Sequence, residues 1–139
     1  MVSGVATALR VLLIEDSVLL AERIGELIRH LPDVDLMGVV DGEAAAIQRV
    51  ADSKPDVLIL DLHLRQGSGF GVLRSLYEAR ERPKVIVLTN HDVSAYRSAA
   101  ELFGVAAFLD KARDYGRLPS LLLTLAQERA SDAQPAPGN

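Results

Sequence analysis

The stretch VLILDLHLRQGSGFGVL, residues 57–73, runs apolar for four residues and then places a carboxylate, Asp61, where the run ends. The same arrangement occurs near the N-terminus, where VLLIEDS carries an apolar run directly into Glu15 and Asp16. Each acid has an ordinary interpretation, as a turn residue or as a charge that favours a helix N-terminus. The repetition of the pattern, however, indicates that all three acids have a common purpose.

Short apolar runs alternate with longer segments of helical period along the chain. The runs lie at residues 9–14, 34–40, 56–60, 84–88 and 105–109, and the helical segments at 17–31, 42–53, 67–81, 93–102 and 114–129. Several runs lack polar alternation, which is typical of strands that are covered on both faces. The sequence therefore predicts an α/β fold with a doubly wound five-stranded parallel sheet.

Local signals place the ends of several helices. Ser17 or Asp16 can cap the first helix and Ser68 the third, because their side-chain oxygens can accept a bond from an orphan backbone amide. Pro32 is expected to end the first helix, and Gly104 to close the fourth in a left-handed turn.

Length and composition narrow the function. The 139 residues fit one domain at 9–129, with an N-terminal extension at 1–8 and a polar, Pro-rich and disordered tail at 130–139. Cysteine is absent, which excludes disulfides and thiol sites. The net charge of −4 and the scattered Lys and Arg residues argue against a nucleic-acid-binding surface. No apolar run approaches the roughly 20 residues of a membrane span, so a cytoplasmic location is expected.

The predicted strand ends bring reactive side chains together. An open parallel sheet forms its site beyond the carboxyl ends of its strands. The residues at or just beyond these ends are Glu15, Asp16, Asp61, Thr89 and Lys111. Three carboxylates, a hydroxyl and an amine are therefore expected at one edge of the sheet.

This set of side chains suits phosphoryl chemistry. Closely packed carboxylates repel one another and need a cation, and oxygen ligands without His or Cys favour Mg²⁺. A divalent ion and Lys111 can offset charge on phosphoryl oxygens. Because an aspartate can act as a nucleophile and form an acyl phosphate, Asp61 is predicted to become phosphorylated.

With these residues in order, the chain resembles the receiver domain of two-component response regulators over residues 9–129. The shared pattern is an acid pair, a second Asp, a Thr, and an aromatic followed three residues later by Lys, each after a successive strand. The segments GVVDGEAA and GSGFGVL also resemble family segments. The resemblance implies the flavodoxin-like (βα)₅ fold with strand order 2-1-3-4-5.

The resemblance implies a role for each site residue. Asp61 is similar to the phosphoacceptor that receives the phosphoryl group from a histidine kinase or phosphotransfer protein in a phosphorelay. Asp16, Asp61 and the backbone carbonyl of His63 would hold Mg²⁺, with Glu15 acting through water. Lys111 would contact the phosphoryl oxygens.

The resemblance also implies a switch. Thr89 would bond to the phosphoryl group, and Phe108 would change between an outward and an inward rotamer. Segments 93–102, 105–109 and 114–129 would form the output face for a downstream protein partner, and a dimer could form through it. The chain would be a signalling phosphoacceptor and no enzyme beyond its own phosphorylation and dephosphorylation. It would lack an output domain, or be a fragment of a longer regulator.

Several positions depart from the commonest family pattern. Arg65 and Ala112 stand where Pro is common, so no cis bond is expected at Ala112. Asn90 replaces a smaller residue and could narrow access to the phosphoryl group. His63 and His91 are expected to border the site and to tune the phosphoryl lifetime, although two solvated loop histidines are an equal alternative.

Three other interpretations fit parts of the sequence. GSGFG suggests a dinucleotide loop, but Val72 stands where the third Gly belongs and the loop follows the third strand. A haloacid dehalogenase-type phosphatase needs a second Asp two residues after the nucleophile, and His63 occupies that place. A receiver-like interaction module that is not phosphorylated stays open, since only a phosphorylation assay decides it.

Overall fold

The computed structural model describes residues 8–90 and 94–133. They contain a five-stranded parallel sheet with the strand order β2-β1-β3-β4-β5. The strands are β1 (Leu9–Ile14), β2 (Val34–Val40), β3 (Val57–Leu60), β4 (Lys84–Thr89) and β5 (Ala107–Asp110). The helices are α1 (Val18–Ile28), α2 (Glu43–Ser53), α3 (Gly69–Ala79), α4 (Ser94–Leu102), the short 3₁₀ helix η1 (Tyr115–Arg117) and α5 (Leu118–Ala133). This is the doubly wound flavodoxin-like order that the sequence predicts.

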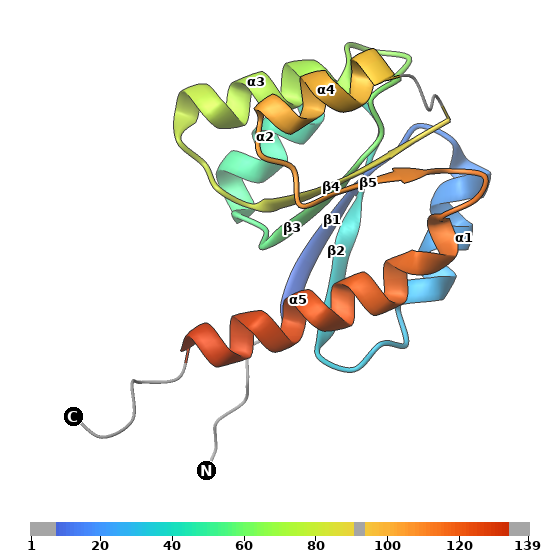
Figure 1. Cartoon of the computed structure of the whole chain (residues 1–139), viewed down its shortest axis with the longest axis vertical. Coiled ribbons are helices and arrows are strands. Elements are labelled where there is room, and N and C mark those ends of the chain that lie inside the picture. The colour runs from blue at the N-terminus through green and yellow to red at the C-terminus, as the bar shows by residue number, and fades with distance from the viewer. Residues whose placement is uncertain (1–7, 91–93, 134–139) are drawn as a thin grey trace.

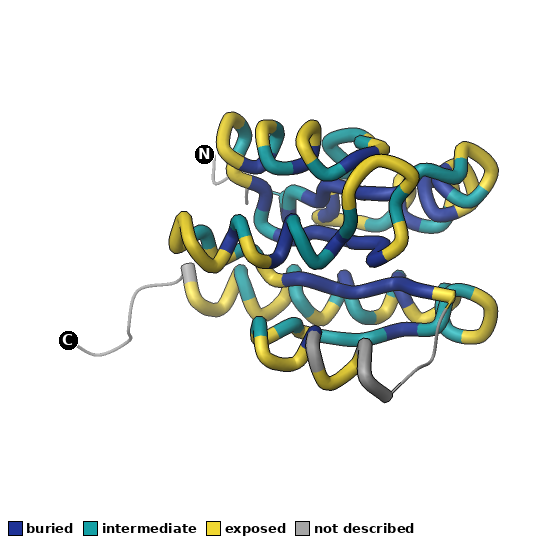
Figure 2. Tube along the Cα trace, turned by 90° about the horizontal axis from the view of Figure 1, so that it is seen from above, coloured by how far each residue is buried: buried dark blue, intermediate teal, exposed yellow. Residues whose placement is uncertain are grey.

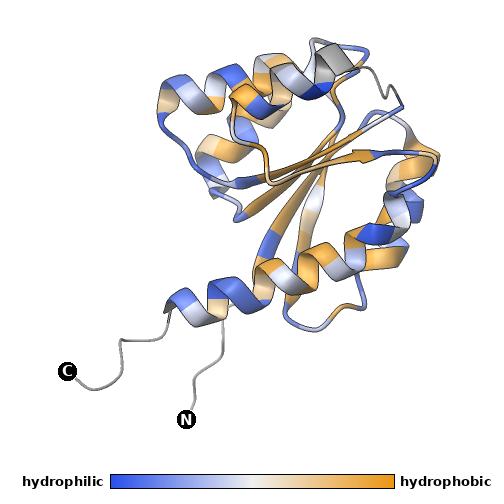
Figure 3. Ribbon diagram, in the orientation of Figure 1, coloured by the Kyte–Doolittle hydropathy of each residue, from blue (hydrophilic) through white to orange (hydrophobic). Residues whose placement is uncertain are grey.

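Helices cover both faces of the sheet. Helices α1 and α5 lie on one face, and α2, α3 and α4 lie on the other (Figure 1). Figure 2 shows the buried strands between outward helical turns that are exposed, and Figure 3 shows that the central strands are largely hydrophobic. The sheet is therefore buried on both sides, which explains the nearly continuous apolar runs.

Alternate side chains of each strand pack into two separate hydrophobic cores. On β3, Val57 and Ile59 pack with α1 and α5, whereas Leu58 and Leu60 pack with α2, α3 and α4. All four side chains are fully buried. Burial of one such aliphatic side chain contributes about 1.5–3 kcal/mol, so the two cores stabilise the central strands.

The predicted caps are confirmed. The hydroxyl of Ser17 accepts a bond from the Leu20 amide at 3.3 Å, and that of Ser68 accepts one from Gly71 at 3.1 Å. Gly104, with φ +71°, follows α4 in the left-handed conformation that favours glycine.

Several predicted boundaries are wrong. Helix α1 ends at Ile28 rather than at residue 31, because the chain tightens into a turn in which the Leu31 amide bonds to the Ile28 carbonyl at 3.2 Å. Strand β5 is displaced by about two residues, and α5 begins at Leu118 rather than at residue 114. Helix α5 also continues to Ala133, so residues 130–133 of the predicted disordered tail are helical. Residues 134–139 and His91 lie outside the described residues.

Candidate functional site

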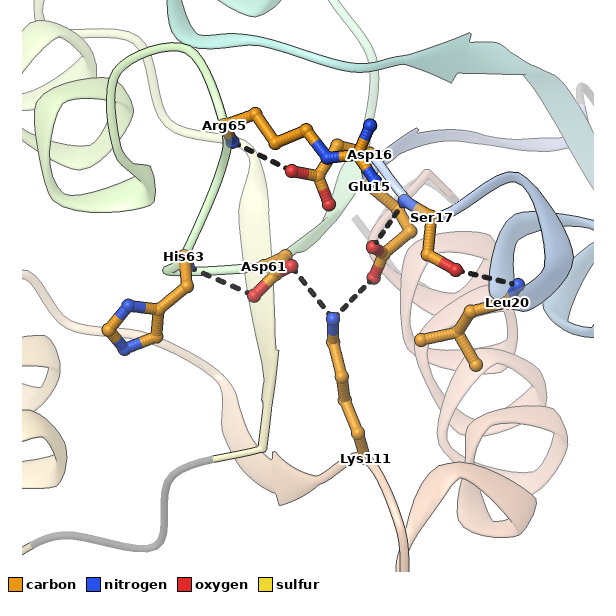
Figure 4. A network of polar contacts seen from close by, with 8 residues as sticks. All are labelled: Glu15, Asp16, Ser17, Leu20, Asp61, His63, Arg65 and Lys111. Atoms are coloured by element: carbon orange, nitrogen blue, oxygen red, sulfur yellow. Dashed lines mark hydrogen bonds and ion pairs between the residues drawn. The ribbon is translucent and has the colours of Figure 1, made fainter.

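Backbone hydrogen bonds continue past the strands and fix the acids at one edge of the sheet. The Glu15 amide donates to the Val40 carbonyl at 2.9 Å, and the Asp61 amide donates to the Ile14 carbonyl at 3.0 Å. On the other side, the Lys111 amide donates to the Thr89 carbonyl at 2.9 Å. The parallel ladder therefore brings together residues up to 96 positions apart in the sequence, and Figure 4 shows the resulting cluster.

Lys111 lies between two buried carboxylates. Its Nζ is 2.7 Å from Asp61 Oδ2 and 2.8 Å from Glu15 Oε1 (Figure 4). Asp61 is 3% exposed and Glu15 is 2% exposed, so both interactions are shielded from water. Charge-assisted bonds in such surroundings are stronger than the same bonds at the surface.

Burial and ion pairing shift the pKa values of Glu15 and Lys111. Burial raises the pKa of the Glu15 carboxyl, and the bonds from Lys111 and from the Ser17 amide only partly offset that rise. Burial lowers the pKa of the Lys111 amine, but the bonds to Asp61 and Glu15 outweigh it and leave the pKa raised. Lys111 is therefore held firmly in its charged form.

Asp16 completes the acidic cluster. One oxygen from each of Glu15, Asp16 and Asp61 lies within 4.8 Å of the others. Asp16 is half-buried, and its Oδ2 accepts a bond from the backbone amide of Arg65 at 2.7 Å. Three carboxylates with one lysine leave two net negative charges, and this oxygen-only donor set fits a hard divalent cation.

The loop that follows Asp61 folds back on it. The His63 amide donates to Asp61 Oδ1 at 3.0 Å, so both carboxylate oxygens of Asp61 are bonded. The imidazole of His63 is exposed and points away from Glu15 and Lys111 (Figure 4). Asn90 is also exposed. The proposed influence of these two side chains and of His91 on the phosphoryl lifetime stays a prediction.

The predicted switch residues lie next to the cluster. Thr89 is fully buried at the end of β4, directly opposite Asp110 of β5 in the sheet register. Phe108 is half-buried and packs against the core beneath α2, α3 and α4. The Cζ atom of Arg97 lies 4.7 Å from the centroid of the Phe108 ring, a cation–π contact that links α4 to β5.

Sequence reasoning missed three contributors to this region. The amide of Arg65 bonds Asp16, the guanidinium of Arg97 covers Phe108, and the carboxylate of Glu43 bonds the Ser68 amide at 2.9 Å. The first has a signal in the sequence, since any residue other than Pro at position 65 supplies a donor. The other two depend on contacts between different helices, strands and loops, which no local pattern in the sequence indicates.

The peptide-bond geometry and the helix lengths can be stated for the described residues. Every peptide bond among them is trans, including the bond that precedes Ala112. None of the described helices has the combination of length and apolarity that a membrane span requires.

The strand order and the acidic edge define a doubly wound α/β protein with a cluster of carboxylates beyond the carboxyl ends of its strands. Residues 11–123 match the response regulator receiver domain, and the chain belongs to that family of two-component systems.

Curated relatives agree with this assignment. The sensory transduction protein LytT of Enterococcus faecalis is 31% identical over 107 residues, which cover 77% of this chain and 40% of LytT. The transcriptional regulatory protein CitB of Klebsiella pneumoniae is 28% identical over 120 residues, which cover 86% of this chain and 51% of CitB. The chain thus spans about half or less of the length of these relatives.

Solved structures give the same result over nearly whole chains. The signal receiver domain of a putative Luxo repressor protein from Vibrio parahaemolyticus superimposes with a TM-score of 0.79 and 30% identity, covering 92% of this chain and 99% of that one. The signal receiver domain of the putative response regulator NarL from Mycobacterium tuberculosis has a TM-score of 0.78 and 25% identity, covering 86% and 97%.

Proposed function

We propose that Asp61 accepts a phosphoryl group from a histidine kinase or a histidine phosphotransfer protein, in the presence of Mg²⁺. The observation that carries this proposal is the position of Lys111 Nζ, 2.7 Å from Asp61 Oδ2 and 2.8 Å from Glu15 Oε1. A cation already in contact with the Asp61 carboxylate is in place to neutralise charge on an incoming phosphoryl group.

Asp16, Asp61 and the backbone carbonyl of His63 would hold Mg²⁺, with Glu15 contributing through water. The clustering of one oxygen from each of the three acids within 4.8 Å supports this ligand set. When bound, the ion would supply positive charge opposite the phosphoryl oxygens.

The transfer itself uses few protein groups. An Asp61 oxygen attacks the phosphorus atom, a P–O bond forms, and the P–N bond of the donor phosphohistidine breaks. The electron pair of that bond leaves with the imidazole nitrogen, which takes up a proton from solvent. Lys111 keeps its proton throughout, in keeping with its raised pKa, and acts as a fixed charge.

The phosphorylated state would be read by Thr89 and Phe108. The Thr89 hydroxyl would bond the phosphoryl oxygens, and Phe108 would move inward, changing the face formed by α4, β5 and α5. A downstream protein partner, or a second copy of the chain, would bind there in the cytoplasm. The cation–π contact of Arg97 with Phe108 supports a coupling between α4 and β5.

Incubation with acetyl phosphate and Mg²⁺ followed by intact-mass measurement tests the proposal. We expect one labile phosphoryl group on the wild-type chain, none on Asp61→Ala, and none after chelation of Mg²⁺. Asp35→Asn, a change at an exposed carboxylate on β2, is the matched control and should be labelled normally. Undiminished labelling of Asp61→Ala would refute the assignment, and an unlabelled wild-type chain would favour an interaction module that is not phosphorylated.

A further inference from the structure

The segment GSGFG, residues 67–71, contains three glycines that the proposed phosphoryl chemistry does not use. A Cβ on Gly69 would collide with the backbone carbonyl oxygen of Asp61 and come within 2.7 Å of Leu62 Cα. Gly69 therefore allows α3 to begin against the end of β3. The other two glycines face a different partner, the side chain of Glu43.

Gly67 and Gly71 leave the space that Glu43 occupies. A Cβ on Gly67 would collide with Glu43 Cβ, and a Cβ on Gly71 would collide with the Glu43 carboxylate. Gly67 also has φ +80°, which disfavours any other residue there. Gly71 lies in the first turn of α3 without a positive φ, so the proximity of Glu43 is the specific obstacle to a larger residue.

Glu43 connects α2 to the loop between β3 and α3. Its amide donates to the Gln66 carbonyl at 3.0 Å, and its Oε1 accepts a bond from the Ser68 amide at 2.9 Å. The residues beside these contacts, Gly42 and Gln66, also form a parallel β-bridge. One residue thus contacts the loop through both its backbone and its side chain.

The position of the Glu43 carboxylate is electrostatically favourable. It lies in the first turn of α2 and also beside the first turn of α3. Helix N-termini carry partial positive charge and unsatisfied amides, so a carboxylate there stabilises both helix starts. The Ser68 hydroxyl accepts from Gly71, which leaves the Ser68 amide for Glu43.

The loop held by Glu43 carries groups of the acidic site. It begins at Asp61, includes the His63 backbone, and its Arg65 amide bonds Asp16 at 2.7 Å. Asp16 therefore holds the middle of the loop, and Glu43 holds its end.

We propose that Glu43 is a positioning residue for the metal site, and that Gly67 and Gly71 are glycines because its side chain fills their space. The proposal rests on the proposed function, since it places the loop in the service of Mg²⁺ binding. Without the Glu43 carboxylate, the Ser68 amide loses its acceptor and only the backbone contacts with Gln66 join the loop to α2. The loop, and with it the His63 carbonyl, would then be held less firmly.

Isothermal titration calorimetry measures the affinity of the unphosphorylated chain for Mg²⁺, which gives a readout that is independent of phosphorylation. Glu43→Ala should weaken Mg²⁺ binding about tenfold, the lower end for loss of a group that orients metal ligands. Glu43→Gln should retain most of the affinity, because its amide oxygen can still accept from the Ser68 amide. Glu78→Ala removes the same charge from the exposed face of α3 and should bind Mg²⁺ like the wild type.

A double-mutant cycle of Glu43→Ala and Gly71→Ala tests the contact between these two residues. The added methyl group displaces the carboxylate, so Gly71→Ala alone should weaken Mg²⁺ binding as much as Glu43→Ala, and the double variant should lose no more. Thermal unfolding adds a second readout. Alanine is the better helix former, so Gly71→Ala should raise the midpoint when residue 43 is Ala, and lower it or leave it unchanged when Glu43 is present.

The outcomes separate the two proposals. A wild-type chain that binds no Mg²⁺ would overturn the proposed metal site and, with it, the role of Glu43. A wild-type chain that binds Mg²⁺, with Glu43→Ala unchanged or with strictly additive effects in the cycle, would overturn only the role of Glu43. Equal losses of Mg²⁺ affinity in Glu43→Gln and Glu43→Ala would assign the effect to charge alone. That result would also overturn the positioning role of Glu43.

Discussion

The backbone amide of Arg65 donates a hydrogen bond of 2.7 Å to Oδ2 of Asp16, across 49 residues of sequence. This bond exists because position 65 is not proline, which has no amide hydrogen. The departure from the commonest family pattern at this position thus gives the Asp16 carboxylate a backbone donor. It also ties the end of β1 to the loop that follows β3.

Arg65→Pro should destabilise the metal-free chain, whereas Arg65→Ala, which keeps the amide, should not. A hydrogen bond to a charged group contributes about 1.5–3 kcal/mol, and the lower value suits this exposed bond. Proline restores about 0.4–1 kcal/mol by restricting the unfolded chain. We therefore expect a net loss of about 0.5–1 kcal/mol in the free energy of unfolding, measured by urea unfolding with a chelator. Equal stabilities of the two variants would mean that the bond contributes nothing.

Lys111→Met should destabilise the metal-free chain strongly, because Glu15 and Asp61 would be left buried without a cation. Removal of one partner from a buried ion pair costs about 3–5 kcal/mol, and we expect about 3 kcal/mol at this sheet edge. Adding Asp61→Asn should recover part of the loss by removing one charge. Lys84→Met, at an exposed lysine of β4, is the control for urea unfolding. A Lys111→Met chain as stable as this control would contradict the network.

The raised pKa of Lys111 predicts a loss of stability at alkaline pH. A group whose pKa is higher in the folded state than in the unfolded state stabilises fully below its unfolded value, here near 10.5. That contribution is lost as the pH rises from there through the folded pKa. Unfolding free energies between pH 9 and 12 should therefore fall in wild type and in Lys84→Met, and fall less steeply in Lys111→Met. Parallel slopes in all three proteins would show that another group is responsible.

Thr89→Ala should still be phosphorylated on Asp61 but should not transmit the change to β5. The hydroxyl that would contact the phosphoryl oxygens is absent, so the modified state makes no differential contact with the switch. Beryllofluoride, which mimics the phosphoryl group, should shift the NMR signals of Phe108 in wild type and in Thr124→Ala, a matched change at an exposed threonine of α5. Equal shifts in Thr89→Ala would exclude this coupling route.

The sequence by itself determined the sheet, its helices and the acids at its edge. Continuous apolar runs are local signals, because a strand covered on both faces has no exposed side to alternate. Strand ends in a parallel sheet share one edge, so Glu15, Asp16, Asp61 and Lys111 could be placed together without any contact being known. The boundaries of α1, β5 and α5 were less accurate, because turns and 3₁₀ segments at helix ends carry weak local signals.

Only the tertiary structure decided which groups hold that edge in place. The contacts of Arg65 with Asp16, of Glu43 with Ser68 and of Arg97 with Phe108 each join different segments of the chain. Their geometry depends on how loops and helices pack against the finished sheet, and no local pattern encodes it. The glycines of GSGFG show the difference well, since the sequence displays them but only the position of Glu43 explains Gly67 and Gly71. A residue that exists to leave space can be understood only when the group that fills the space is seen.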